Sequence, residues 1–327
     1  MPIFNDKQWD IHHGDCIPHM LDDMPENSVD FSVFSPPFPS LYAYTDSVSD
    51  VGNVDSVGAE ARIHLGFMFA GLCRVLKPGR AAVVHVCQIP RMKRSGGVGL
   101  CDFRGMNIRL GERAGLIYEY DWSVRKNPQA QAIRTRSREL QFSGLENDRS
   151  AQRGTLQDYL IKFRKPGKNE TPIRDWVMDT FEDTKQELRV NIHKPQVSRN
   201  EWIDWAEGCW SDIQETDTLN TKVAKSDDDT KHICPLQLEV IRRCVLLYSN
   251  PGELVFSPFA GIGSEGYVSL GGKSPKTGKR IADARRFYGC ELKKEYFDQA
   301  CKNLAKADGF CEPDDQYSLF DFAEQSV

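Results

Sequence analysis

The sequence lacks the features that would assign it to several specialised classes of protein. It has no run approaching 18 apolar residues and no low-complexity tract, and its first residues, MPIFNDKQWDIHHGDC, contain no cationic stretch followed by an apolar segment. We therefore expect no membrane span, no secretion signal and a cytoplasmic protein. Its ten cysteines include no C-x-x-C pair, which argues against a zinc site and against a disulfide framework.

Charge is unevenly distributed along the chain. The 327 residues carry a net charge of −5, yet residues 91–168 hold 17 Lys and Arg against 8 Asp and Glu, whereas residues 169–231 hold 15 acidic and 8 basic residues. A basic span of this kind predicts a surface for a polyanion, the alternative being a solvated basic face. The reversal of charge predicts a boundary or an inserted region near residues 166–172.

Short apolar runs alternate with helical patterns. The helical patterns cover residues 59–79, 235–252 and 293–307, where apolar residues recur every three or four positions. The runs are rich in β-branched and aromatic residues without strict alternation, which is typical of strands that are covered on both faces. They span residues 29–35, 81–87, 116–124, 158–165, 253–257 and 288–292. This order predicts an α/β fold, a doubly wound and mostly parallel sheet.

A glycine-bearing loop follows the predicted strand at 253–257. The sequence SPFAGIGSEG places Gly261 and Gly263 between that strand and a helix, where an open α/β sheet binds its ligands. Glu291 ends the next strand, and a carboxylate at that place can accept both hydroxyls of a ribose. The alternatives are a plain tight turn for the loop and a solvated acid at a helix start for Glu291.

Two further turns carry polar side chains at strand ends. Asp15 lies in a Gly-Asp turn ahead of a helix, and Ser35-Pro36-Pro37-Phe38 follows the strand at 29–35. Alone, the second turn could be an ordinary proline-rich loop.

Taken together and in this order, these motifs resemble the beta group of S-adenosylmethionine-dependent DNA amino-methyltransferases. The resemblance covers residues 8–165 and 231–305. It implies a Rossmann-like fold with a circularly permuted motif order, S-adenosylmethionine as cofactor with S-adenosylhomocysteine as product, no metal, and double-stranded DNA as partner. It also implies a bacterial or phage-encoded protein that works in bacterial cytoplasm, with restriction-modification as one setting.

The resemblance also divides the chain into parts. Residues 1–166 would form the catalytic half of the methyltransferase domain and residues 231–311 the cofactor-binding half. An inserted target-recognition region would span residues 167–230, and residues 312–327 would form an acidic tail. The tryptophans of the insertion, at positions 176, 202, 205 and 210, are expected to form a small core, the alternative being platforms for stacked bases.

By the same likeness, a set of residues is assigned to the cofactor. Phe259, Gly261 and Gly263 would hold its methionine end, Glu291 its ribose and Asp15 its adenine edge. Ser257 is also assigned to the cofactor, but it stands where the family usually has an aspartate, which leaves open what binds the amino group of the cofactor. His232 and Pro235 would pack beside it.

The Ser35 turn would then serve the target amine, cytosine N4 or adenine N6, whose lone pair is delocalised into the ring. Ser35 Oγ and the Pro36 carbonyl can accept its N–H groups and favour a tetrahedral nitrogen in the transition state. Pro36 and Pro37 stiffen the turn, and Phe38 offers a face for the base. Ser at the first motif position favours cytosine N4, with adenine N6 as the alternative.

The base must be flipped out of the duplex to reach this turn, while basic side chains hold the phosphates. The expected phosphate contacts are Arg91, Lys93, Arg94, Arg125, Lys126, Arg134, Arg136 and Arg138.

The tail contains Gln316-Tyr317-Ser318-Leu319-Phe320, which resembles the pentapeptide with which bacterial proteins dock on the replication sliding clamp. The alternative is a tail that packs on its own domain. Three other functions also stay open: an RNA methyltransferase, a protein-glutamine methyltransferase, and a catalytically inactive DNA-binding protein.

Overall fold

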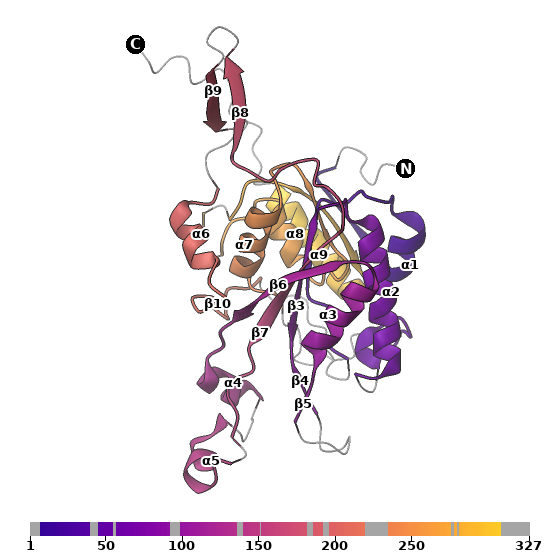
Figure 1. Cartoon of the computed structure of the whole chain (residues 1–327). Helices are drawn as coiled ribbons and strands as arrows, with labels where there is room; N and C mark the ends of the chain where they lie inside the picture. Colours follow the sequence, from indigo (N-terminus) through magenta and orange to yellow (C-terminus); the bar gives the residue numbers. More distant parts are fainter. Residues whose placement is uncertain are drawn as a thin grey trace.

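The computed structural model describes residues 7–39, 45–54, 57–91, 99–135, 140–150, 152–181, 186–191, 196–219, 235–275, 278–279 and 281–308. Its centre is an eight-stranded sheet in the order β1-β12-β11-β2-β3-β7-β6-β10 (Figure 1). Only β7 runs antiparallel to its neighbours in this sheet. The strands are β1 (Trp9–His13), β2 (Phe31–Phe34), β3 (Ala81–Cys87), β6 (Ile117–Val124), β7 (Asp158–Arg164), β10 (Cys209–Trp210), β11 (Leu254–Ser257) and β12 (Arg286–Glu291).

Helices cover both faces of this sheet (Figure 1). One face carries α1 (Cys16–Pro18), the π-helix η1 (His19–Asp23), α2 (Ala59–Val75) and α3 (Phe103–Arg113), and the other carries α7 (Leu238–Tyr248), α8 (Ser264–Ser269) and α9 (Lys294–Asp308). Two apolar cores result, one on each side. The prediction of a doubly wound, mostly parallel sheet is confirmed, and the continuous apolar runs are explained because every residue of β2 and β11 is buried.

The elements predicted from the sequence are all present, with differences at their ends. The helix expected over residues 59–79 stops at Val75, ahead of Pro78, because Leu76 turns to an extended conformation. The helix expected over residues 235–252 begins at Leu238, after Pro235. Within the described ranges, none of the helices is long and apolar enough to cross a membrane.

Two projections leave the carboxyl edge of the parallel strands. One is the hairpin of β4 (Ile89–Pro90) and β5 (Leu100–Cys101), which continues β3, and the other contains α4 (Pro128–Thr135) and α5 (Phe142–Asn147), between β6 and β7. A third projection, the hairpin of β8 (Trp176–Phe181) with β9 (Gln186–Asn191), follows β7 and therefore leaves at the opposite edge (Figure 1). The connections of the basic span that follow β3 and β6 thus leave at one edge of the sheet, and the β8–β9 hairpin of the acidic span leaves at the other.

The span predicted as an insertion contributes to the main sheet. After α6 (Arg199–Trp205), β10 pairs in parallel with β6. Trp205 and Trp210 are buried in the core that also contains Trp122 of β6, and the indole N–H groups of Trp122 and Trp210 both donate to the Trp205 carbonyl. The prediction that the tryptophans are core residues and not platforms for stacked bases is therefore confirmed for these two, although the core they join is the main one and not a small one. Trp202 is 52% exposed, and the side chain of the fourth, at position 176, lies outside the described set.

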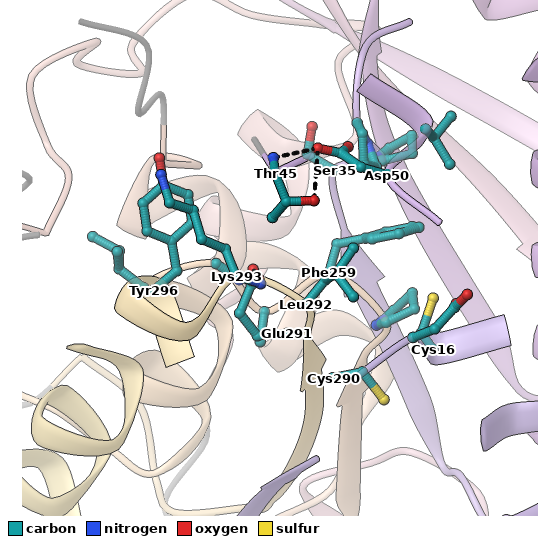
Figure 2. Close-up of a pocket in the computed structure, with 18 of the residues that line it drawn as sticks. Cys16, Ser35, Thr45, Asp50, Phe259, Cys290, Glu291, Leu292, Lys293 and Tyr296 are labelled. Carbon is teal, nitrogen blue, oxygen red and sulfur yellow. Dashed lines mark hydrogen bonds between the residues drawn. The ribbon is translucent and has the colours of Figure 1, made fainter. Parts of the chain in front are cut away.

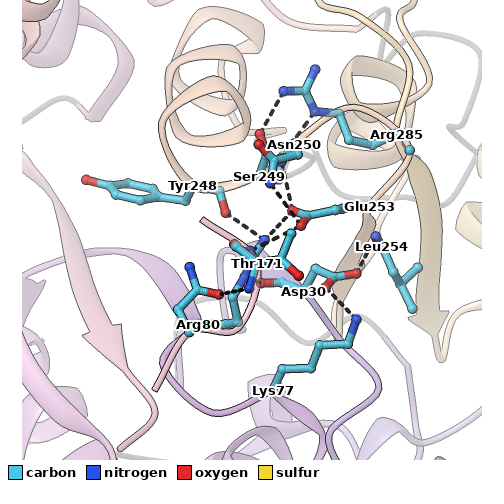
Figure 3. Close-up of polar contacts among 12 residues, drawn as sticks. Asp30, Lys77, Arg80, Thr171, Tyr248, Ser249, Asn250, Glu253, Leu254 and Arg285 are labelled. Carbon is cyan, nitrogen blue, oxygen red and sulfur yellow. Dashed lines mark hydrogen bonds and ion pairs between the residues drawn. The ribbon is translucent and has the colours of Figure 1, made fainter. Parts of the chain in front are cut away.

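A buried polar network closes the amino edge of the sheet (Figure 3). Asp30, ahead of β2, accepts from Lys77 Nζ at 2.6 Å and from the Leu254 amide of β11 at 2.9 Å. Arg80, which is 2% exposed, pairs with Glu253 and donates to the Asp30 carbonyl at 2.7 Å. Since these charges are paired and hydrogen-bonded, they fix the starts of β2, β3 and β11. The carboxyl ends of the same strands then point to the site.

Candidate active site

A pocket opens at the carboxyl edge of the sheet, where the turns after β1, β2, β11 and β12 meet (Figure 2). This is the place at which open α/β sheets bind ligands, outside the carboxyl ends of neighbouring strands. Its lining includes residues 14–16, 35–38, 45, 49–51, 235–236, 258–262, 264–265, 290–293 and 296. Segments more than 200 residues apart in the sequence thus share one cavity.

The glycine loop after β11 folds back on the end of β12. Gly261 has φ +53° and donates its amide to Glu291 Oε2 at 2.8 Å. Gly263 has φ +83° and lies at the start of α8, where a Cβ would come within 3.2 Å of Ala300. Both glycines therefore hold a backbone shape that other residues rarely adopt. Gly261 and Phe259 line the pocket, whereas Gly263 shapes the loop without lining it.

Glu291 and Asp15 are held by backbone amides. Glu291 accepts from Gly261 and, through Oε1, from the Lys293 amide at 2.9 Å. Burial raises the pKa of Glu291 to about 7, although these amide bonds act to lower it. Each carboxylate oxygen has a second lone pair for a ligand hydroxyl. Asp15 caps α1 by accepting from the Ile17 amide at 2.9 Å.

Acidic side chains outnumber basic ones in the pocket. Its lining contains four acids, Asp15, Asp50, Glu265 and Glu291, against one cation, Lys293. Asp50 and Glu265 are only 4% and 5% exposed. Burial, reinforced by the charge of Glu291, raises the pKa of Glu265 to about 8. A cavity with this excess of acids favours a ligand that carries positive charge and hydroxyl groups.

We predict that Glu265→Gln stabilises the protein at alkaline pH. The unfolded chain loses the Glu265 proton near the ordinary value of 4.5, before the folded protein does at about 8. Stability from this group is therefore complete below pH 4.5 and lost as the pH rises to 8. In urea unfolding, Glu265→Gln should exceed the wild type by about 4 kcal/mol at pH 8 and match it at pH 4.5. Glu112→Gln on the surface of α3 is the control, and equal gains at both pH values would contradict the assignment.

Ser257 lies at the end of its strand, as the sequence predicts, but it is not part of the pocket wall. It ends β11 fully buried, its Oγ has no hydrogen-bond partner among the described residues, and it does not line the pocket. The prediction of a direct cofactor contact at Ser257 is therefore not supported. Asp50 does line the pocket, where it accepts from the amides of Thr45 at 2.7 Å and Gly52 at 2.8 Å.

The Ser35 turn forms the opposite wall (Figure 2). Ser35, Pro36, Pro37 and Phe38 all line the pocket, and the Phe38 ring packs edge-on to Phe103 with centroids 5.5 Å apart. Figure 2 shows Ser35 beside Thr45 and Asp50, across the pocket from Glu291 and Lys293. The residues predicted for the cofactor and those predicted for the target amine thus meet in one cavity.

Three charged or titratable side chains lie behind Ser35. Ser35 Oγ is 3.1 Å from His85 Nδ1, and His85 Nε2 is 2.9 Å from Asp158 Oδ2. Lys126 Nζ lies 2.6 Å from the same oxygen and is 8% exposed. The prediction of Lys126 as a phosphate contact is therefore wrong, since this charge is buried and paired.

The other residues predicted for DNA are only partly described. Arg91 and Arg125 are exposed, at the base of the β4–β5 hairpin and just after β6. Arg134 lies in α4, but its side chain is not described. Outside the described residues lie Lys93, Arg94, Arg136, Arg138, His232 and the tail motif at 316–320.

Cysteine chemistry has no visible role in the pocket. Cys290 and Cys16 line it, but burial raises the pKa of both thiols, so neither forms a thiolate at neutral pH. Among the residues described, no three His, Cys, Asp or Glu side chains gather into a metal site.

The sheet, the glycine loop after β11 and the amide-held acid after β12 define a nucleotide-cofactor-binding α/β protein. The family model described as DNA methylase, which covers the N6 and N4 methyltransferases, matches residues 29–302, and the chain belongs to this family.

The chain is also similar to a curated protein in sequence and to solved structures in fold. The type II methyltransferase M1.MboII of Moraxella bovis is 28% identical over 160 residues, which are 46% of this chain and 55% of that protein. The chain thus matches about half the length of this relative. The fold resembles TTHA0409 of Thermus thermophilus, a DNA modification methylase solved with S-adenosyl-L-methionine (TM-score 0.59, 19% identity, 91% of this chain and 93% of that one). It also resembles the PvuII DNA methyltransferase, described as cytosine-N4-specific (TM-score 0.55, 15% identity, 94% and 88%).

Proposed function

We propose that the protein transfers a methyl group from S-adenosylmethionine to the exocyclic amine of a base flipped out of double-stranded DNA. The observation that carries this proposal is the single pocket lined by Ser35-Pro36-Pro37-Phe38 on one side and by the Gly261 loop and Glu291 on the other. The family and the type II methyltransferase relative support it. Ser35 favours cytosine N4, and adenine N6 is the second candidate.

The residues present fit this cofactor. Glu291 would accept the ribose hydroxyls, Asp15 would bind the adenine edge, and Phe259 and Gly261 would hold the methionine end. Asp50 would bind the amino group of the cofactor, the role of the aspartate that the family has at position 257. It lines the pocket with a carboxylate, whereas Ser257 does not line the pocket. The cofactor supplies an electrophilic methyl group when bound.

The turn would act on the amine by accepting its hydrogens. Ser35 Oγ and the Pro36 carbonyl draw the two N–H groups out of the plane of the base, which localises the nitrogen lone pair. Phe38 stacks on the base and is itself held by Phe103. The amine is thereby aligned for in-line attack, and this alignment supplies much of the acceleration.

Phosphate contacts are proposed for the carboxyl-edge projections. Arg91 and Arg125 are exposed there, and Lys93, Arg94, Arg134, Arg136 and Arg138 lie in the same connections. Residues 167–230 are proposed to recognise the target sequence only through the segment after β10, since that strand ends at the site edge and the β8–β9 hairpin leaves at the other.

We also propose how the chain is organised and where in the cell it acts. The halves at 1–166 and 231–311 would form one methyltransferase domain in bacterial cytoplasm, whether chromosomal or phage-encoded, within or outside a restriction system. The tail at 312–327 would dock on the sliding clamp, and a clamp pull-down that survives deletion of these residues would remove that idea.

Calorimetry and label transfer test the proposed function. S-adenosylmethionine should bind, and its labelled methyl group should appear in duplex DNA and not in RNA or in a protein glutamine. Absence of cofactor binding would favour a catalytically inactive DNA-binding protein, and label in RNA or protein would favour one of the other methyltransferases.

A further inference from the structure

Ser35 is the first member of a chain of side chains that crosses three strands. Because β2 pairs in parallel with β3 through Phe34 and Val84, the next residues along each strand, Ser35 and His85, are neighbours. The antiparallel β7 then brings its first residue, Asp158, to the far side of the imidazole. The distances are 3.1 Å from Ser35 Oγ to Nδ1 and 2.9 Å from Nε2 to Asp158 Oδ2.

The protonation of this chain follows from Asp158. Burial alone would raise the pKa of Asp158, but His85 and Lys126 outweigh it and lower the pKa to about 2. An ionised carboxylate only accepts hydrogen bonds, so it favours the imidazole proton on Nε2. Nε2 lies 2.9 Å from Oδ2 in a geometry that falls short of a hydrogen bond. The Ser35 hydroxyl donates to the His85 carbonyl oxygen at 3.2 Å, and Nδ1 of the same residue, 3.1 Å from Oγ, is a second acceptor for this proton.

We propose that His85 is the positioning residue and proton acceptor for the methylated amine, acting through the Ser35 hydroxyl; this rests on the proposed function. As the new N–C bond forms and the S–C bond breaks, the electron pair stays on sulfur and the amine nitrogen is left with one proton too many. That proton passes to Ser35 Oγ while the Ser35 proton passes to His85 Nδ1. The imidazolium is stabilised by Asp158 and releases the proton to solvent.

The same side chains occur in Ser-His-Asp hydrolases, but here Ser35 is not a nucleophile. Such a nucleophile needs backbone N–H groups beside it to stabilise an oxyanion. The two residues after Ser35 are prolines, which have no N–H. The two ring nitrogens of His85 also have the opposite places from those in the hydrolases, because here Nδ1 faces the serine, whereas Nε2 does so there.

Other titratable groups lie near His85, and a pH profile of the rate must distinguish their effects from that of His85. Asp158 of β7 and Lys126 after β6 contact the chain directly. Asp50, Glu265 and Glu291 line the pocket from the other elements, and protonation of these acids alters cofactor binding. The rate must therefore be measured in a single turnover with cofactor and DNA saturating at each pH.

The test compares wild type, His85→Gln and the control His64→Gln on α2. Gln can still bond to Ser35 but cannot take a proton. We expect His85→Gln to slow methyl transfer about 10- to 100-fold, with unchanged binding of S-adenosylmethionine and DNA. The wild-type and His64→Gln rates should fall toward acid pH, and the His85→Gln rate should not. Imidazole added to His85→Ala should restore part of the rate.

Two results would overturn the proposal: a His85→Gln enzyme with the wild-type rate and pH profile, or a slow His85→Ala enzyme that imidazole does not rescue although it is folded and binds cofactor.

NMR titration of the His85 ring gives a readout without turnover. The double variant Asp158→Asn/Lys126→Met, which leaves no buried charge unpaired, should make the ring harder to protonate, and an unchanged titration contradicts the role of Asp158. Failure of the wild type to methylate DNA would instead refute the proposed function.

Discussion

Ser35→Ala should lower the rate of methyl transfer about 100- to 1000-fold, the effect expected when one donor or acceptor aimed at transition-state charge is removed. The variant loses the acceptor for the target amine and the link to His85 at once. Binding of S-adenosylmethionine should be unchanged, because Ser35 lies on the wall opposite Glu291 (Figure 2). Single-turnover kinetics and calorimetry measure the two quantities separately.

Ser32→Ala is the matched control for this substitution. Ser32 is on β2, the strand that Ser35 follows, and its Oγ donates to the Phe256 carbonyl at 2.9 Å in the core beneath the site. We expect it to cost about 1 kcal/mol of stability and to leave the rate intact. Equal losses of rate in both variants would mean that Ser35→Ala acts by disturbing β2, and wild-type turnover by Ser35→Ala would remove the assigned role.

Glu291→Gln should weaken S-adenosylmethionine binding about 10- to 100-fold. The amide has one oxygen where the carboxylate has two, so its NH₂ would face the amide of either Gly261 or Lys293, both of which are donors. A hydrogen bond to a charged group contributes about 1.5–3 kcal/mol, which corresponds to that loss of affinity. Calorimetry against Glu295→Gln, an exposed acid on α9, makes the comparison. If both variants bind S-adenosylmethionine equally well, the ribose does not contact Glu291.

Much of this site could be predicted because its residues stand at strand ends. Ser35 and Glu291 follow continuous apolar runs, and the carboxyl ends of parallel strands share one edge whatever the order of the strands. Local sequence therefore identified both walls of the pocket. It could not pair Ser35 with His85 and Asp158, because that contact depends on the register of β2, β3 and β7. A histidine within the apolar run AAVVHVC was the available signal.

Charge counting was less informative than strand position. Lys126 contributed to a basic span, but counting does not show which side chains turn inward, and this one is buried against Asp158. Likewise the missing aspartate at Ser257 was evident, whereas Asp50 as a second source of a carboxylate was not. Asp50 reaches the pocket from a separate segment around η2 (Val51–Asn53), which no local motif marks.

The central claim is that the Ser35 turn presents an exocyclic amine of DNA to the cofactor. Mass spectrometry of nucleosides from duplex DNA incubated with the protein and methyl-labelled S-adenosylmethionine tests it most directly. The account predicts labelled N4-methylcytosine, or N6-methyladenine if the second candidate base is the substrate, and neither product with Ser35→Ala. Two results would contradict the central claim. One is label on a ring carbon, as in 5-methylcytosine, and the other is the absence of any labelled nucleoside although the wild-type protein binds the cofactor.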